Sequence, residues 1–403
     1  MKNFTGFLIK QQRLQRGLSQ EGLCRGICAV SYLSKIEQGM GNPSPLILEQ
    51  LLDKLQIHFN QNQDQLDQAK AMLDGYFDKY FHSETAEKET TYLKLHQREM
   101  ENSELHLNWH LFNLFSLIQR HGKNAPVCHQ ELSYLARFTE YMETDQLFLY
   151  YVGAGLVDSE EQLEMLRLAE TIRPLSFVKQ SKAEVYYSRR DYMNAISAAD
   201  RAYSAAAEEG SLPILLWSSY LLGACYANFN DLSFMLKYYK RARELSRGYD
   251  VSISSLIDSN IGTAYVEHGV FQEARPYLIA SLEPKDQVSR EQKLLACQKL
   301  ALCCFEAGDM PGGLKYLQNA ADQKSPSMSG IYDQLLYFTD LRYVQGDKVS
   351  GEYEGVLKEL YQSNEETISE GYRRLFARWL VELYTAQRKY KDALAIQAEN
   401  GYL

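Results

Sequence analysis

Residues 17–39 read GLSQEGLCRGICAVSYLSKIEQG, and this stretch decides the fold of the amino-terminal part of the chain. Its apolar residues recur at spacings of three and four, which predicts helices. Ser19 is a favourable N-cap for the first of them, because its side-chain oxygen can accept a hydrogen bond from a free backbone N–H. The segment Gly26-Ile27-Cys28 predicts a turn, and a second helix is expected from about Val30 to Gln38. Two short helices joined by a tight turn are the arrangement that places its second helix in the major groove of DNA.

The expected helix at residues 30–38 has two different faces. At 100° per residue, Val30, Leu33 and Ile36 share one face, which we expect in the core. Glu37 falls toward this buried side and needs a cation, so we expect it to pair with Arg13. The opposite face is polar and suits a groove of the duplex. The residues that we expect to contact DNA are Gln20, Ser31, Tyr32, Ser34, Lys35, Gln38 and Asn42. For any one of them, an ordinary solvated position is the alternative.

Charge and cysteine content restrict the class of protein. The 403 residues carry a net charge of −9, but residues 1–60 hold seven Lys/Arg against four acids. A basic head on an acidic body fits a head that binds phosphates and a body that does not bind nucleic acid. Seven cysteines without a CxxC pair indicate buried free thiols in a reducing compartment. With no signal peptide and no apolar run of about 18 residues, we expect a cytoplasmic protein without a membrane partner.

Beyond about residue 175 the chain repeats itself with spacings of 38 to 42 residues. Successive copies begin at Ala183, Gly223, Gly262, Ala301, Thr339 and Val381, and each is followed by a turn at about residues 190, 230, 269, 308, 346 and 388. A small residue lets a second helix approach closely, a tyrosine fills the wedge, and the turn joins the helices, which is typical of tetratricopeptide repeats. Armadillo and HEAT repeats have similar periods, but the order of residues favours tetratricopeptide repeats. Residues 84–175 are expected to form earlier, more diverged hairpins.

These patterns predict an all-α fold. We expect a five-helix Cro/repressor-like helix-turn-helix domain followed by a right-handed tetratricopeptide-repeat superhelix. The expected domains are a DNA-binding head at residues 1–62, a linker helix at 63–82, and a peptide-binding and dimerisation domain at 83–403.

First-helix residues that flank the small repeat position are expected to face a groove. An extended peptide in such a groove offers free N–H and C=O groups, and amide side chains supply both a donor and an acceptor. Aromatic walls add pockets for peptide side chains. The candidates are Trp217, Tyr220, Asn228, Ser259, Asn260, Thr263, Glu267, Gln298, Phe305, Tyr343 and Arg378. Helix packing or solvation is the alternative for each.

The head resembles the Cro/repressor (XRE) class, and with the array the whole chain resembles the RRNPP peptide-pheromone receptors of Gram-positive bacteria. This resemblance implies a cytoplasmic homodimer that binds operator DNA and takes a short linear signalling peptide into the concave groove. It also implies that an asparagine before the small repeat residue bonds the peptide backbone, which Asn260 matches and Asn228 matches more loosely. Ala29 departs from relatives that carry a polar residue able to cap the recognition helix.

Other activities have weaker support in the sequence. His106 and His110 lie one helical turn apart, as zinc ligands can, but no third ligand accompanies them. The sequence has no glycine-rich phosphate-binding loop and no Ser, His and Asp in the order of a catalytic triad. We therefore expect that the protein binds no metal or cofactor and is not an enzyme. The alternatives are an adaptor that binds a response regulator through the array, and a Rap-type phosphatase acting on such a partner.

Overall fold

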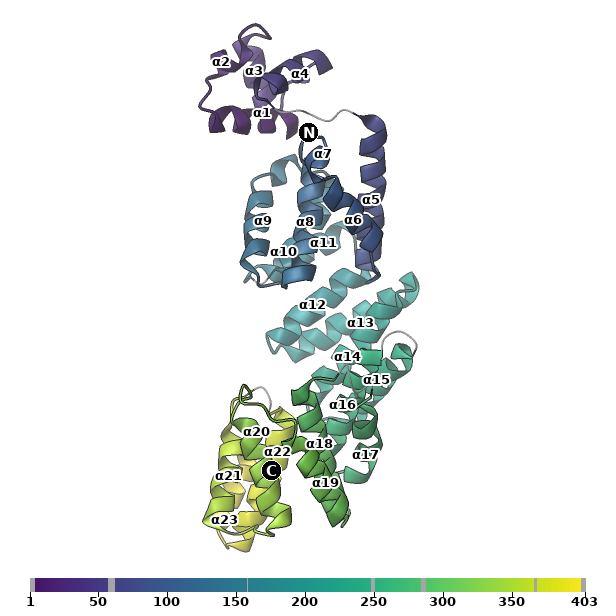
Figure 1. The fold of residues 1–403 in the computed structure, drawn as a ribbon, viewed down its shortest axis with the longest axis vertical. Coiled ribbons are helices and arrows are strands. Elements are labelled where there is room, and N and C mark those ends of the chain that lie inside the picture. The colour runs from purple at the N-terminus through teal and green to yellow at the C-terminus, as the bar shows by residue number, and fades with distance from the viewer. Residues whose placement is uncertain are drawn as a thin grey trace. The chain divides into compact units, whose positions relative to one another are not determined.

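The computed structural model describes residues 4–56, 62–157, 159–247, 251–283, 288–365 and 368–399. Within these residues every regular element is a helix and none is a strand, which confirms the all-α prediction (Figure 1). The chain divides into two compact units, Met1–Val185 with Ser204–Ile214 and Tyr186–Tyr203 with Leu215–Leu403. The domain boundaries expected at residues 62 and 82 stay a prediction.

The described residues of the head form four helices around a small core. The helices are α1 (Phe4–Gln15), α2 (Gln20–Cys24), α3 (Val30–Glu37) and α4 (Pro45–Lys54). Leu33 and Ile36 are buried in this core as expected, but Val30 is 42% exposed because it begins α3, at the edge of the core. Five helices were expected. The next helix, α5 (Gln63–Phe81), packs against α6 and α8 instead, and residues 57–61 lie outside the described residues.

The rest of the first unit consists of helical hairpins around an aromatic core. Its elements are α6 (Glu87–Leu95), α7 (Gln97–Glu101), α8 (His106–His121), α9 (Pro126–Ala136), the short 3-10 helix η1 (Thr139–Tyr141), α10 (Thr144–Leu156), α11 (Gln162–Ile172) and α12 (Ser176–Ser188). Neighbours along the chain pack together, as α8 does with α9 and α10 with α11. Tyr76, Phe112, Phe115 and Phe148 are fully buried in the core. The expected early hairpins are therefore present.

All six predicted repeat segments lie on helices, and each is followed by a second helix. The first helices are α12, α14 (Leu212–Asn228), α16 (Val251–Glu267), α18 (Arg290–Glu306), α20 (Ile331–Thr339) with the π-helix η2 (Asp340–Val344), and α22 (Glu370–Ala386). The second helices are α13 (Tyr192–Glu209), α15 (Leu232–Ser246), α17 (Phe271–Ala280), α19 (Met310–Ala321), α21 (Gly351–Gln362) and α23 (Tyr390–Glu399). Within the second unit, α16 packs on α17, α18 on α19 and α22 on α23 (Figure 1).

The six expected turns share one backbone conformation. Each contains a residue with a φ between +57° and +77°, namely Arg190, Asn230, Gly269, Gly308, Gly346 and Arg388. Glycine adopts this left-handed conformation without a steric penalty, whereas a residue with a side chain does so at some cost. Because the conformation occurs in all six copies, it is a fixed part of the repeat and confirms the predicted turns.

The small position of the repeat lets two helices come into direct contact. A Cβ atom at Gly262 would lie 2.7 Å from Cγ and 3.2 Å from the backbone nitrogen of Leu278 on α17. A Cβ at Gly223 would lie 2.6 Å from the ring of Tyr239 on α15. The repeat tyrosines fill the adjoining space, since the ring centroids of Tyr265 and Tyr277 are 5.9 Å apart. The tetratricopeptide packing predicted from the sequence is thus confirmed.

This close approach can be tested with two glycine-to-alanine substitutions. We expect Gly262→Ala to lower the free energy of unfolding by about 1–2 kcal/mol, because overpacking against α17 outweighs the gain in helix propensity. Gly355→Ala is the control, because Gly355 is an exposed residue inside α21 with no atom within 4 Å of its would-be Cβ. It should raise the free energy by up to about 1 kcal/mol. Urea denaturation measures both, and a stabilised Gly262→Ala protein would contradict the packing argument.

Candidate functional site

The start of α2 and the approach to α3 take the geometry expected of a helix-turn-helix. Ser19 is the N-cap of α2, and its Oγ accepts a hydrogen bond from the backbone N–H of Gly22 at 2.9 Å, as predicted. Gly26 has a φ of +83°, which suits the turn between the helices. Ala29 is the N-cap of α3 and offers no side-chain hydrogen bond, so this helix begins without a side-chain cap.

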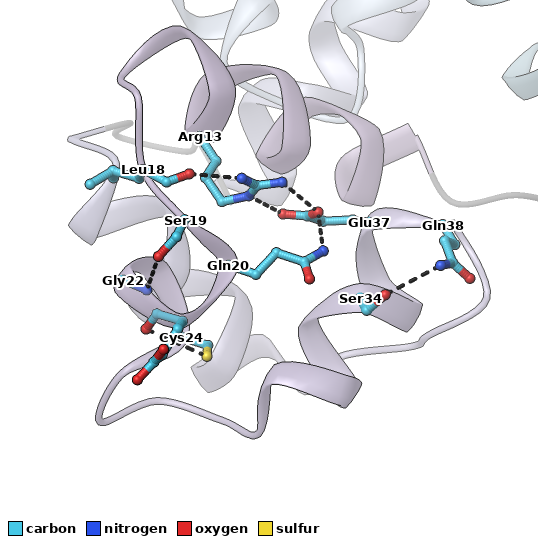
Figure 2. Close-up of polar contacts among 10 residues, drawn as sticks. Arg13, Leu18, Ser19, Gln20, Gly22, Cys24, Ser34, Glu37 and Gln38 are labelled. Atoms are coloured by element: carbon cyan, nitrogen blue, oxygen red, sulfur yellow. Dashed lines mark hydrogen bonds and ion pairs between the residues drawn. The ribbon is translucent and has the colours of Figure 1, made fainter.

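A buried ion pair fixes α3 against α1. Nε and Nη2 of Arg13 donate to the two carboxylate oxygens of Glu37 at 2.6 and 3.0 Å, which confirms the predicted pair (Figure 2). Nη1 of Arg13 also donates to the carbonyl of Leu18 at 2.7 Å. Both side chains are buried, and the hydrogen bond with Glu37 raises the pKa of Arg13. Removing either partner would leave the other charge buried without compensation, which is strongly destabilising.

Gln20 belongs to this ion-pair cluster. Its Nε2 donates to Oε2 of Glu37 at 2.8 Å, and its side chain is half-buried (Figure 2). The side chain expected to reach a phosphate is therefore engaged within the head. A phosphate contact by Gln20 stays a prediction. In this structure the Gln20 side chain hydrogen-bonds Glu37.

The polar face of α3 is largely open to solvent. Ser31, Lys35 and Gln38 are exposed, as is Asn42 in the loop that follows. Ser34 is half-buried and its Oγ accepts from Nε2 of Gln38 at 3.2 Å (Figure 2). The half-buried Tyr32 donates its hydroxyl to the carbonyl of Asn42 at 3.1 Å, so it orders the loop. The face thus keeps one cation and several hydrogen-bonding groups available.

The second unit contains a cavity of about 390 Å³ on the first helices of its repeats. Four of the residues expected to contact a peptide line it, namely Asn228, Asn260, Thr263 and Glu267. The other lining residues are Tyr187, Arg190, Tyr192, Ala224, Ala227, Met235, Tyr239, Ala264, Asn364, Glu365, Ile368, Ser369, Gly371 and Arg373. Amides, charged groups and aromatic rings are therefore present together at one hollow, which is a common composition for ligand sites.

The two asparagines already make hydrogen bonds within the unit. Nδ2 of Asn260 donates to the hydroxyl of Tyr220 at 2.9 Å, and Nδ2 of Asn228 donates to the carbonyl of Ala224 at 2.9 Å. These bonds orient the two amides on neighbouring first helices. Tyr220, expected to contact a peptide, thus positions Asn260.

Helix α22 contacts α16 beside the cavity, and two predicted residues take part. Arg378 on α22 donates to the carbonyls of Glu267 and His268 at the end of α16. Glu267 accepts a hydrogen bond from the hydroxyl of Ser369. Arg374 reaches the carbonyl of Ala227 in α14 at 3.1 Å. Cations are favourable at helix C-termini, so α22 is held by the ends of two earlier helices.

Gln298, a predicted peptide contact, is buried and already engaged within the unit, and its contact with a peptide stays a prediction. It is 1% exposed, donates to Oγ1 of Thr339 at 3.0 Å and accepts from the hydroxyl of Tyr372 at 3.0 Å. Its amide is therefore used in the packing of α18 with α20 and α22. Thr263 accepts from Nζ of the buried Lys299 at 2.7 Å, so its hydroxyl is engaged as well.

The remaining predicted contacts lie away from this cavity. The rings of Tyr343 and Phe305 stack with centroids 5.1 Å apart, and the Tyr343 hydroxyl donates to Glu306. Phe305 is 8% exposed and serves the packing of α18 with η2. Trp217 and Ser259 line a separate, smaller cavity on α14 and α16. The predicted set is thus divided between two hollows and the helix packing.

Several residues that line the larger cavity were not among the predicted peptide contacts. Tyr187 follows the repeat tyrosine of the first copy, and Tyr239 packs against Gly223, so the repeat register could have indicated both. Ser369, Gly371 and Arg373 come from the start of α22, more than 100 residues after Asn260. No local pattern predicts this return of the last repeat to the third.

Other features weighed in the sequence have ordinary contacts. His106 bonds the carbonyl of Glu101 and the hydroxyl of Tyr134, and burial lowers its pKa to about 4. His110 contacts Glu131 at 2.6 Å. Over the described ranges, no three metal-ligating side chains lie together, and no helix is long and apolar enough to cross a bilayer. All seven cysteines are free thiols and six of them are buried, as predicted for thiols on helices.

Comparisons with known proteins agree with this organisation. The helix-turn-helix family matches residues 9–61. The transcriptional activator NprA of Geobacillus stearothermophilus is 23% identical over 396 residues, covering 91% of this chain and 95% of NprA. The apo form of the quorum sensor NprR from B. thuringiensis matches with a TM-score of 0.61 at 16% identity, over 83% of this chain and 98% of that one. The apo form of RapI matches with a TM-score of 0.60 at 13% identity, over 82% and 96%. The chain has the architecture of the RRNPP family. This confirms the predicted resemblance, and the two solved structures support it at the level of the fold.

Lys299 is buried beside the larger cavity and should make the stability of the protein depend on pH. Burial lowers the pKa of Lys299 to about 8, against 10.5 for an ordinary lysine, with Glu267, Cys303 and Tyr372 as its titratable neighbours. Between about pH 8 and pH 10.5, Lys299 is protonated in the unfolded chain but largely deprotonated in the folded one. Because the unfolded state then binds more protons, Lys299 makes the free energy of unfolding rise with pH. Relative to Lys299→Met, the wild-type free energy of unfolding should therefore increase across this window.

Urea denaturation at several pH values measures this difference. Lys391→Met is the control, because Lys391 is exposed on α23, and its difference from wild type should stay flat. An equally flat difference for Lys299→Met would show that the lysine is protonated normally in the folded chain.

Proposed function

We propose that this chain is a cytoplasmic, homodimeric transcription regulator of quorum sensing. Its head binds double-stranded operator DNA, and a short linear signalling peptide bound in the repeat array controls that binding. The observation that carries the proposal is the exposed polar face of α3 in a chain whose repeat array has a hollow lined by Asn228 and Asn260. The names of the relatives, a transcriptional activator and a quorum sensor, support it. The free thiols favour a reducing compartment.

The proposed regulation is a binding equilibrium and catalyses no reaction. A head of this class reads one half-site, so a homodimer would read two, spaced by about one turn of the duplex or more. The peptide can change DNA affinity only by binding two arrangements of the protein with different affinities. The larger cavity borders the contacts between α16 and α22, so a peptide there would strengthen or replace them.

The face of α3 is tested by removing its outward polar groups. Ser31→Ala with Lys35→Ala should weaken binding to a duplex selected from a randomised library by about 5-fold to 150-fold, while the melting temperature stays unchanged. Lys10→Ala removes an exposed charge from α1 and is the matched control. Gln20→Ala is unsuitable as a DNA probe, because its loss of the Glu37 contact should also lower the melting temperature. If a gel shift shows unchanged affinity for the double variant, the polar face of α3 does not contact DNA.

If the selection yields no duplex at all, the transcriptional proposal itself fails. The adaptor and phosphatase alternatives would then be examined with a phosphorylated response regulator. Release of inorganic phosphate would identify a Rap-type activity, and binding without release would identify an adaptor.

The asparagine on α16 is tested in the peptide response. The probes are hexapeptides that the wild-type protein retains from a randomised synthetic pool. Asn260→Ala should weaken their binding by about tenfold, the value of one or two hydrogen bonds, and leave peptide-free DNA binding intact. Gln272→Ala is the control, because it removes an exposed amide on α17 that lines neither cavity, and it should leave the titration unchanged. Equal titrations for wild type and Asn260→Ala would show that the peptide backbone does not contact this residue.

A further inference from the structure

The smaller cavity in the second unit has an apolar wall that is partly exposed among the described residues. It measures about 280 Å³ and lies where α14, α16 and the residues before α18 meet. Trp217, Ile253 and Leu256 line it, and each of these large side chains is only half-buried. Val288 completes the wall. An exposed aromatic and aliphatic surface that is also concave is typical of a ligand site.

Several polar groups at this cavity already make hydrogen bonds within the protein. The hydroxyl of Ser255 donates to the carbonyl of Ser281. Gln292 forms a reciprocal capping box with Ser289 at the start of α18, with hydrogen bonds of 3.0 and 3.2 Å. The apolar side chains therefore supply most of the surface that remains for a ligand. A polar or charged group placed there would lose its hydration without gaining a full set of partners.

The size of the cavity limits its occupant. A volume of 280 Å³ lies just below the range of sites that hold whole drug-sized ligands, which is about 300–1,000 Å³. It suits one large side chain, while the rest of the ligand lies outside it.

The larger cavity is close enough to hold the rest of the same ligand. Ser259 lines the smaller cavity and Asn260, the next residue of α16, lines the larger one. From Ser255 to Glu267 the helix rises by about 18 Å. An extended peptide covers this distance with about five or six residues.

We propose that the smaller cavity is an anchor pocket for one large apolar side chain, such as Leu, Ile or Phe, of the peptide whose backbone contacts Asn260. This inference rests on the proposed function, because it assumes that the array binds a peptide. It adds the chemical class of the peptide: about six residues, with an obligatory apolar residue at one end of the bound segment and polar neighbours toward Asn260.

The experiment compares the peptides retained by the wild-type full chain and by Ser259→Phe from a randomised pool of hexapeptides. The wild type should retain sequences restricted to Leu, Ile or Phe at one position. Ser259→Phe places a ring in the pocket, so it should bind the same peptides at least about tenfold more weakly and lose that restriction. Ser259→Ala adds no bulk and is the matched control. Circular dichroism and the melting temperature verify that each variant is folded.

A second variant keeps the test decisive if Ser259→Phe does not fold. Trp217→Ala removes the aromatic wall and should likewise weaken the selected peptides and relax the apolar position. Retained peptides without an apolar position, or a restriction that survives both substitutions, would overturn the anchor pocket and leave peptide binding standing. Retention of no peptide by the wild type would overturn the proposed function and the anchor pocket with it.

Discussion

The close approach of two helices at a glycine is the constraint on which the repeat array depends. At Gly223 and Gly262 a single added carbon would overlap Tyr239 or Leu278 of the paired helix. Protein interiors are packed as densely as organic crystals, so neighbouring layers could not absorb that carbon without shifting. The left-handed residue at each turn then fixes how the paired helices follow one another. Together these features set which residues of α14, α16 and α18 remain available to line a cavity.

Helix α22 packs against α16, and this packing engages some of the residues that were predicted to contact a peptide. Gln298, Thr263 and Arg378 have the side chains that a peptide backbone needs, but here they bond to Thr339, Tyr372, Lys299 and backbone carbonyls. Buried polar groups must find partners. Here α18, α20 and α22 supply side-chain partners to one another and to α16. Asn228 and Asn260 instead line a cavity that the start of α22 also borders. The same residue types therefore serve helix packing at some positions and line a cavity at others.

Features fixed by local spacing could be predicted from the sequence, and so could one distant pair that charge demands. The Ser19 cap and the six turns follow from local spacing. The Arg13–Glu37 pair joins residues 24 positions apart, and it was predictable because a buried carboxylate needs a cation. The engagement of Gln20 with Glu37 depends on the angle between α2 and α3, which no pattern gives. The Arg378 contact joins residues 111 positions apart, so repeat register alone assigned that side chain to an open groove. The sequence thus identified the repeats but not where the last one docks.

The contacts of α22 have energies of the size that the proposed regulation by a peptide would need. A tenfold change in DNA affinity requires a difference of about 1.4 kcal/mol between two arrangements. A hydrogen bond to a charged group is worth about 1.5–3 kcal/mol, and Arg374 and Arg378 make three such bonds from α22 to α14 and α16. The gain or loss of one such bond is thus an energy of the same size. Because Glu267 lines the cavity and its carbonyl accepts from Arg378, a ligand beside Glu267 would act directly on the bonds that hold α22 in place.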